Sequence, residues 1–326
     1  MVNLYKFTIN FYKRSSKYNE KSKIKLLFNL GNCRNFICNR INKSNQYLYI
    51  MKICVVAIFK NESHVLKEWL EHYLREGVDT FLLIDNDSSD NYKPILEPFL
   101  HSKQAFLKKS KKKHAQVELY NRWLPEAKKF DWVIVVDMDE FIYARNGFKT
   151  IKAYLETVNK DIYKIEIPWK LFGSSGLKKQ PDSVIQNFIH RKKFPKISTH
   201  INLSERVIYI KTISRGSHFQ KIGLHNSVIT NLHQSFPVRN ISSDSRILRE
   251  IGLGNRSFTI MIEPFLKKHS LHLNHYRIQS WEFYKKVKMT RGDGAVKRFN
   301  NIRNRKYFQI HDYKDMKDTE LRDKKY

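Results

Sequence analysis

Three acidic residues directly follow the most strand-like run of the chain. Residues 132–141 read WVIVVDMDEF, so Asp137, Asp139 and Glu140 come immediately after five apolar residues. A short β-branched run predicts a buried strand, and ligands bind where such strands end in open α/β sheets. Clustered carboxylates repel one another unless a cation offsets them. Hard oxygen ligands of this kind suit Mg²⁺ or Mn²⁺ bound together with a substrate diphosphate.

The alternative interpretation of this segment is a surface turn with solvated acids. A turn does not explain why the most acidic point of a basic chain follows its most strand-like run. We therefore favour the ligand site.

The preceding residues predict the elements that would position this site. A buried strand is expected at Ile53–Phe59, a helix with one apolar face over residues 63–76, and a second strand at Thr80–Ile84. Gly77 would end the helix. A strand, a helix and a strand at this spacing form a βαβ unit with a parallel strand pair.

A further helix, from about His114 to Lys129, leads to the acidic strand. The first half is thus expected to be a small doubly wound sheet with polar groups at its strand ends. These groups are Asn61, Asp85, Asn86, Asp137 and Asp139. The sequence contains no glycine-rich phosphate loop of either common type.

The charge of the chain indicates an anionic partner. Its 326 residues carry 61 Lys and Arg against 31 Asp and Glu, a formal net charge of +30. Nucleic acid, a membrane surface and a nucleotide sugar are all anionic. The charge is spread along the chain and no nucleic-acid-binding motif is present, which argues against specific nucleic-acid binding. Lys, Asn, Ile and Tyr usage also fits an AT-rich genome, which weakens arguments from charge.

Two basic segments flank the expected domain. Residues 1–50 contain ten Lys or Arg and one acid, and we interpret them as a basic extension. Residues 296–326 are interpreted as a basic C-terminal tail, a solvated helix or loop. Both termini could make peripheral contact with an anionic surface.

The cysteines and the apolar runs favour a soluble protein in a reducing, cytoplasmic compartment. Cys33, Cys38 and Cys54 are an odd number without a C-x-x-C pair, which argues against a disulfide scaffold or a structural zinc site. The apolar stretch 47–59 is interrupted by Lys52 and is too short to span a bilayer. We expect no transmembrane segment.

The motifs, taken in order, resemble a known enzyme group. The segments FKNE (59–62), EWLEHYLREGVD (68–79), IDNDSSD (84–90), DMDEF (137–141), IPWKLFGSSG (167–176) and NHYRIQSWEFYKK (274–286) are similar to those of glycosyltransferase families 2 and 92, which have the GT-A fold. The likeness covers residues 51–295. It implies a Rossmann-like, mostly parallel sheet with helices on both faces, a nucleotide-sugar half at 51–145 and an acceptor half at 146–295.

The resemblance also implies a reaction and a donor site. The reaction is metal-dependent transfer of a sugar from a nucleotide sugar, a UDP-sugar, to a glycan or glycoconjugate, and the metal is Mn²⁺ or Mg²⁺. Asn61 and Glu62 match the family's N-E pair, and Asp85 with Asn86 matches the site that reads the base and ribose. Each of these residues could instead form a cap or a turn.

Asp137 and Asp139 match the family's metal-binding pair. His275 lies in an H-Y-R stretch that the family shares, and imidazole is a good Mn²⁺ ligand, so His275 is a candidate third ligand. Arg277 is then placed to bind diphosphate oxygens. Lys211, in KTI, and His225, in GLH, have family-like surroundings and compete for the same roles.

The acceptor half offers an aromatic platform and a flexible loop. Trp169 follows an expected strand at residues 165–167, and Gly173 and Ser174 belong to the loop after it. Sugars stack their apolar faces on such rings, and glycine lets backbone approach a substrate. The alternative for Trp169 is a place in the core.

The sequence leaves the catalytic base open. An inverting transfer, which the resemblance favours, needs a base within hydrogen-bonding reach of the acceptor hydroxyl. The candidates are Glu140, beside the metal pair, and Asp182, after the acceptor loop.

Two rival classes remain. A strand ending in D-x-D also opens haloacid dehalogenase-type phosphatases, in which the first Asp is the nucleophile. Those enzymes expect Thr or Val where this chain has Phe141, and they carry the motif near the start of the domain. A non-catalytic nucleotide or sugar binder could share the fold but would not need both Asp137 and Asp139.

Overall fold

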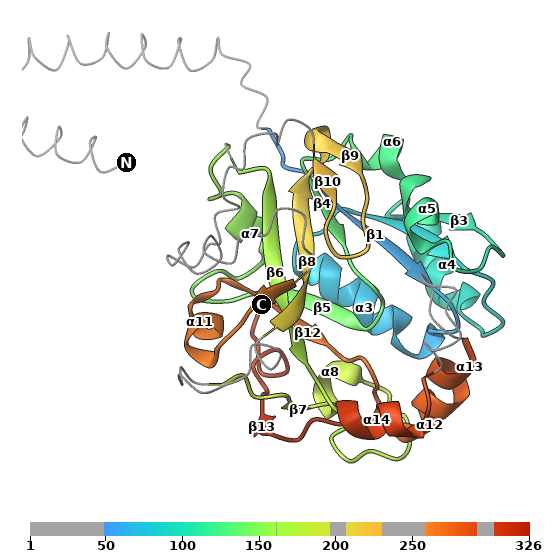
Figure 1. Ribbon diagram of the computed structural model, residues 1–326. Coiled ribbons are helices and arrows are strands. Elements are labelled where there is room, and N and C mark those ends of the chain that lie inside the picture. Colours follow the sequence, from blue (N-terminus) through green and yellow to red (C-terminus); the bar gives the residue numbers. More distant parts are fainter. Residues whose placement is uncertain (1–48, 161, 196–206, 230–257, 292–302) are drawn as a thin grey trace, which may run out of the picture. The chain divides into compact units, whose positions relative to one another are not determined.

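The structure, a computed structural model, describes residues 49–160, 162–195, 207–229, 258–291 and 303–326 (Figure 1). Met51–Tyr326 forms one compact unit. The basic extension up to residue 48, with Cys33 and Cys38, lies outside the described residues. In the part of the chain that is described, no helix is both long and apolar enough to cross a membrane.

The first half of this unit alternates strands and helices, as expected. The expected strand, helix and strand are present as β1 (Ile53–Phe59), α3 (Ser63–Arg75) and β2 (Thr80–Asp85). The elements that follow in order are α4 (Lys93–His101), β3 (Ala105–Lys109), α5 (Gln116–Asn121), α6 (Leu124–Ala127) and β4 (Trp132–Val135). The strand β3 was not predicted, and the single helix expected at 114–129 is two short helices.

The strand order creates a crevice at the ends of β1 and β4. The sheet begins β3-β2-β1-β4, and all three of these strand pairings are parallel. The chain moves outward from β1 to β3 and then returns to place β4 on the other side of β1. In an open α/β sheet, a reversal of this kind opens a ligand-binding crevice beyond the carboxyl ends of the two strands.

Alternating side chains of β1 face two separate layers. Ile53, Val55 and Ala57 belong to a cluster that includes the buried face of α3. Cys54 and Val56 belong to a second cluster, which α5 and α6 complete. Helices therefore cover both faces, and the α/β fold class is confirmed.

The second half extends the same sheet with strands of both directions. The order continues β4-β8-β6-β12-β5, where β8 is Val207–Arg215, β6 is Lys164–Leu171, β12 is Leu271–His275 and β5 is Glu140–Ala144. The pair β6–β12 is parallel, whereas β8 and β5 run antiparallel to their neighbours. The smaller elements are α7 (Ile151–Leu155), α8 (Val184–Asn187), β7 (His190–Arg191), a 3₁₀ turn (Gly216–His218), β9 (Phe219–Lys221), β10 (Val228–Ile229), β11 (Phe258–Ile260), α11 (Glu263–Lys268), α12 (Trp281–Phe283), a π-helical turn (Tyr284–Lys288), α13 (Met289–Arg291), α14 (Arg305–His311) and β13 (Met316–Lys317).

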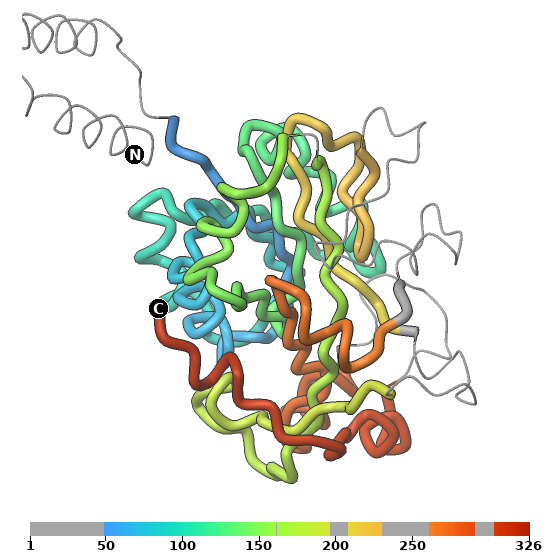
Figure 2. Tube along the Cα trace, turned by 90° about the vertical axis from the view of Figure 1, so that its left-hand side faces the viewer, coloured from blue at the N-terminus to red at the C-terminus, as the bar shows by residue number. Residues whose placement is uncertain are grey.

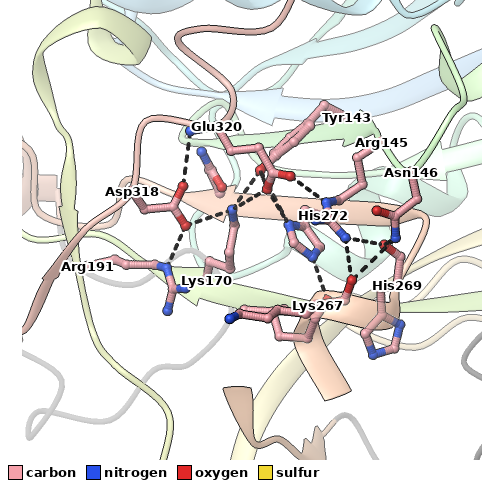
Figure 3. Close-up of polar contacts among 12 residues, drawn as sticks. Tyr143, Arg145, Asn146, Lys170, Arg191, Lys267, His269, His272, Asp318 and Glu320 are labelled. Atoms are coloured by element: carbon pink, nitrogen blue, oxygen red, sulfur yellow. Dashed lines mark hydrogen bonds and ion pairs between the residues drawn. The ribbon is translucent and has the colours of Figure 1, made fainter. Parts of the chain in front are cut away.

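The C-terminal residues 312–326 form a strap over the domain rather than the solvated tail that we expected. In Figure 2 this segment, in red, runs along the outside of the fold to the C-terminus. Its strand β13 pairs with β7, and the Asp318 carboxylate accepts hydrogen bonds from Lys170 Nζ at 3.0 Å and Arg191 Nε at 2.6 Å (Figure 3). The expected boundary at residue 295 therefore falls inside the compact unit.

A second strap carboxylate continues this network. Glu320 accepts from Arg145 Nε at 2.5 Å and from the Tyr143 hydroxyl at 2.8 Å, and it lies 2.9 Å from His272 Nδ1 (Figure 3). Lys170, which is fully buried, donates to the same Tyr143 hydroxyl at 2.6 Å. Buried charges require such partners, so the strap completes the interior of the second half of the domain.

Removing one strap carboxylate should destabilise the whole domain. Asp318→Ala leaves Lys170 and Arg191 without their shared partner, and breaking a buried pair typically costs about 3–5 kcal/mol. We expect a loss of this size in the free energy of unfolding, measured by urea denaturation. The control is Asp323→Ala, because Asp323 is exposed and its carboxylate pairs with the neighbouring Arg322 rather than with a buried cation. Equal stability of the two variants would contradict the structural role of the strap.

Acid should destabilise the domain partly through His72. This imidazole is fully buried and donates from Nε2 to the Ile142 carbonyl at 2.7 Å. Burial, with the nearby charges of Lys324 and Arg75, lowers its pKa from 6.5 to about 3. The unfolded chain therefore takes up the proton first, and stability falls as the pH drops from 6.5 towards 3.

One such group contributes about 1.4 kcal/mol per pH unit within that window. His72→Gln can keep the hydrogen bond but does not titrate, so its stability should fall less steeply with decreasing pH than that of the wild type. The measurement is chemical denaturation at several pH values. Parallel curves for the two proteins would contradict the assignment.

Candidate functional site

A pocket lies at the crevice where β1 and β4 end. The chain after β1 contributes Lys60 and Glu62, and the chain after β4 contributes Asp137 and Asp139. The remaining lining residues are Ile58, Phe59, Asn86, Gln116, Trp169, Leu224, His225, His275, Arg277, Lys288 and Arg303.

The Asp137 carboxylate is held by three groups from other elements. Oδ2 accepts from Lys211 Nζ on β8 at 2.9 Å. Oδ1 accepts from Gln116 Nε2 at 2.9 Å and from the Tyr120 hydroxyl at 3.0 Å, both on α5. Burial alone would raise the pKa of Asp137, but the Lys211 ammonium outweighs it and the pKa is lowered. Asp137 is therefore an anion whose position is fixed before any ligand binds.

Glu140 lies beneath this arrangement and does not line the pocket. Its side chain is fully buried, its Oε2 accepts from the backbone N–H of Asp137 at 2.9 Å, and Lys211 Nζ lies 3.2 Å from the same oxygen. Burial raises the pKa of Glu140 well above its ordinary value. Glu140, predicted as a candidate base, holds the turn that carries Asp137 and is not among the residues that line the pocket.

Asp139 faces two partners across the pocket. Its Oδ2 accepts from Lys288 Nζ at 2.5 Å, and its Oδ1 lies 3.5 Å from His275 Nε2 on β12. Burial would raise the pKa of Asp139, but the Lys288 ammonium and then His275 lower it well below its ordinary value. Burial also lowers the pKa of His275, which favours the neutral imidazole that a metal ligand requires.

The residues fit a divalent cation with fewer protein ligands than predicted. Among the described residues, no three His, Cys, Asp or Glu side chains converge as a metal-binding group. Asp137 turns to Lys211, whereas Asp139 Oδ1 and His275 Nε2 converge on one point of the pocket wall. One carboxylate and one imidazole suit Mn²⁺ or Mg²⁺ when substrate phosphates and water supply the other ligands.

Of the residues predicted to bind the nucleotide, Asn86 and Glu62 reach the pocket lining. Asn61 has φ 55° and its Oδ1 accepts from the backbone N–H of Ser89 at 2.7 Å. The Asp85 carboxylate accepts from the backbone N–H of Ser88 at 2.8 Å and from the hydroxyl of Tyr92. Asn61 and Asp85 thus shape the turn after β2 and are not part of the lining.

Of the predicted acceptor residues, Trp169 lines the pocket and Gly173 and Ser174 do not. Trp169 lines the pocket, with its ring centroid 4.2 Å from that of His275 and 5.1 Å from that of His225. Its ring nitrogen is buried and has no hydrogen-bond partner among the described residues. Gly173 and Ser174 pack against the strap, where Ser174 N–H donates to Asp312 Oδ1 at 2.7 Å.

The last two predicted residues also differ in position. Asp182 is exposed and lies outside the lining, whereas Arg277 lines the pocket with its guanidinium 5.0 Å from the centre of the Tyr307 ring. Sequence reasoning did not identify Lys288 or Arg303. Nothing in the composition distinguishes these two residues within a chain of 61 basic residues.

The fold and the site together define an α/β protein with a pocket of charged side chains at the point where the strand order reverses. Residues 50–324 match glycosyltransferase family 92, and the chain belongs to this family. A family 92 protein of Ricinus communis is 23% identical over 248 residues, 72% of this chain and 37% of that protein. A family 92 protein of Oryza sativa subsp. japonica is 26% identical over 138 residues, 40% of this chain and 23% of that protein. The chain therefore spans less than half the length of these relatives.

Two solved structures are also similar to this chain. TarS 1-349 of S. aureus in complex with UDP-GlcNAc has a TM-score of 0.32 and 16% identity, covering 51% of this chain and 46% of that one. GalNAc-T7 with UDP, GalNAc and Mn²⁺ has a TM-score of 0.30 and 16% identity, covering 38% of this chain and 23% of that one.

Glu140→Gln should separate a structural from a catalytic role. Glutamine can still accept the Asp137 N–H, so we expect a folded protein in which the rate of the reaction proposed below falls by less than about tenfold. Loss of a general base typically costs about 10²–10⁴-fold. The measurement is the steady-state rate at saturating donor, with unfolding temperature as the check on folding. A loss of a hundredfold in a stably folded variant would restore Glu140 as the base.

Proposed function

We propose that this chain transfers a sugar from a nucleotide sugar, a UDP-sugar, to a hydroxyl group of a glycan or glycoconjugate. The observation that carries the proposal is the position of Asp137 and Asp139. Both line a pocket at the strand-order reversal, together with His275 and Arg277, in a chain of glycosyltransferase family 92.

The pocket has the charges that a nucleoside diphosphate needs. Lys60, Arg277, Lys288 and Arg303 line it, and Arg277 presents the planar fork that suits phosphate oxygens. Asp139 and His275 would hold Mn²⁺ or Mg²⁺. Such a cation neutralises charge on the diphosphate, which makes it a better leaving group.

The nucleoside is assigned to the rim formed by Glu62 and Asn86. Asn86 Nδ2 donates to the carbonyls of Ser110 at 3.0 Å and Lys112 at 2.9 Å, and these two hydrogen bonds fix the orientation of the side-chain amide. A fixed polar group of this kind can select a hydrogen-bonding partner without reorganising.

The acceptor sugar is assigned to the side of the pocket that Trp169 forms. For an inverting transfer, His225 lines the pocket, whereas Glu140 and Asp182 lie outside the lining. Burial, and then the charge of Lys211, lowers the pKa of His225 to about 4, so its imidazole is neutral at pH 7 but a weak proton acceptor. We assign His225 to accept a hydrogen bond from the acceptor hydroxyl and so orient it.

A phosphatase mechanism is less well supported. It requires Asp137 to attack phosphorus as a nucleophile. Both Asp137 oxygens instead accept hydrogen bonds, from Lys211 on one side and from Gln116 and Tyr120 on the other.

The first test is calorimetric titration of UDP with and without Mn²⁺. We expect Mn²⁺ to strengthen UDP binding in the wild type, and Asp139→Ala to lose that enhancement because Asp139 Oδ1 is one of the two candidate metal ligands. Asp182→Ala is the matched control, since Asp182 is an exposed carboxylate outside the lining. A subsequent screen of UDP-sugars for hydrolysis would identify the sugar. Failure of the wild type to bind UDP or any other nucleotide would refute the proposed function.

A further inference from the structure

Lys288 is a buried cation in the wall of the pocket. Its side chain is 1% exposed, its Nζ lies 2.5 Å from Asp139 Oδ2 and 3.5 Å from Glu62 Oε1, and it lines the pocket between these two carboxylates. A buried ion pair contributes little net stability, because the desolvation of both charges offsets their attraction. Its place in a pocket wall therefore suggests a role beyond folding.

The backbone at Lys288 is unusual in a way that supports this role. Residues Tyr284–Lys288 form a π-helical turn between α12 and α13, which Figure 1 shows at the lower right of the fold. Single π-helical turns occur frequently at functional sites. The segment is anchored beside the start of α3, where the rings of His64 and Phe283 lie 4.3 Å apart and Gln279 Oε1 lies 2.9 Å from His64 Nε2.

The described lining carries more positive than negative charge before a metal binds. The three carboxylates of Glu62, Asp137 and Asp139 face the four cationic side chains of Lys60, Arg277, Lys288 and Arg303. Lys211, behind the wall, adds a further cation that pairs with Asp137 and Glu140. A diphosphate that enters this pocket meets a permanent positive charge beside the metal-binding carboxylate.

We propose that Lys288 binds the donor diphosphate and that its fixed charge makes donor binding only partly dependent on a divalent cation. This inference rests on the proposed function and names a further residue of the same donor site. Lys288 holds Asp139 Oδ2, which leaves Oδ1 and His275 Nε2 facing the position assigned to the metal. The ammonium and the metal then act side by side on the same diphosphate.

The test is calorimetric titration of UDP and of uridine in the presence of EDTA. The proteins are the wild type, Lys288→Met, which keeps the length but not the charge, and Lys288→Arg, which keeps the charge. The control is Lys286→Met, because Lys286 is exposed and lies two residues away in the same turn. Unfolding temperatures show whether each variant is folded, and Lys288→Gln replaces the Met variant if that variant does not fold.

We expect wild type to bind UDP in EDTA, more weakly than with Mn²⁺. Lys288→Met removes a charge-assisted hydrogen bond to the diphosphate, so it should weaken UDP binding in EDTA by about tenfold or more. Uridine binding should stay within about threefold of wild type, and Lys288→Arg should recover part of the UDP affinity. Lys286→Met should resemble wild type.

Three results would contradict either the inference about Lys288 or the proposed function. If wild type binds UDP with Mn²⁺ but not in EDTA, the inference about Lys288 is wrong and the proposed function stands. If Lys288→Met weakens uridine and UDP binding equally, Lys288 only shapes the pocket and the inference is also wrong. If wild type binds no UDP under either condition, the proposed function itself fails.

Discussion

The architecture depends on balancing the acids that the sheet collects at the end of β4. Asp139 and Glu140 are buried and Asp137 is partly buried, and clustered carboxylates in such surroundings are costly unless cations lie beside them. The cations come from elsewhere in the chain: Lys211 is on β8 and Lys288 lies after β12. The second half of the domain must therefore pack against the first for Asp137 and Asp139 to remain charged. The fold and the site therefore depend on the same ion pairs.

The sequence predicted those parts whose signals are local. The strand β1, the helix α3 and the strand β2 were identified from periodicity, and the D-x-D motif was identified from its position after an apolar run. The strand β3 was not predicted because two of its five residues, AFLKK, are lysines and because it lies on the edge of the sheet. Edge strands face solvent on one side and so lack a clear apolar pattern. The cationic partners of the acids were not predicted for another reason. Lys211 is 74 residues from Asp137 and Lys288 is 149 residues from Asp139, and no local sequence pattern indicates contacts over such separations.

The composition of the C-terminal segment led to a wrong structural prediction. The strap holds many charged residues, which usually indicates solvated chain, and it was interpreted as such. Its key acids instead pair with cations of the domain: Asp318 pairs with the buried Lys170 and Arg191, and Glu320 pairs with the partly buried Arg145. Gly173 and Ser174 were assigned to the substrate because glycine allows close approach. The close approach is real, but the backbone that approaches Gly173 belongs to Tyr313 of the strap. The glycine correctly indicated a close backbone contact, and in the structure the segment that makes this contact is the strap.

The strap also bears on how the protein is made. Lys170 is placed in β6 during synthesis, yet its carboxylate partner Asp318 is 148 residues later. A ribosome adds about 5–20 residues per second, so the chain carries this lysine for several seconds before its counter-ion exists. During that interval the second half of the domain lacks a partner for a buried charge and cannot reach its native stability. The first half, whose β1–α3–β2 contacts are local, can form much earlier. Vectorial synthesis should therefore separate the two halves in time, although they share one continuous sheet.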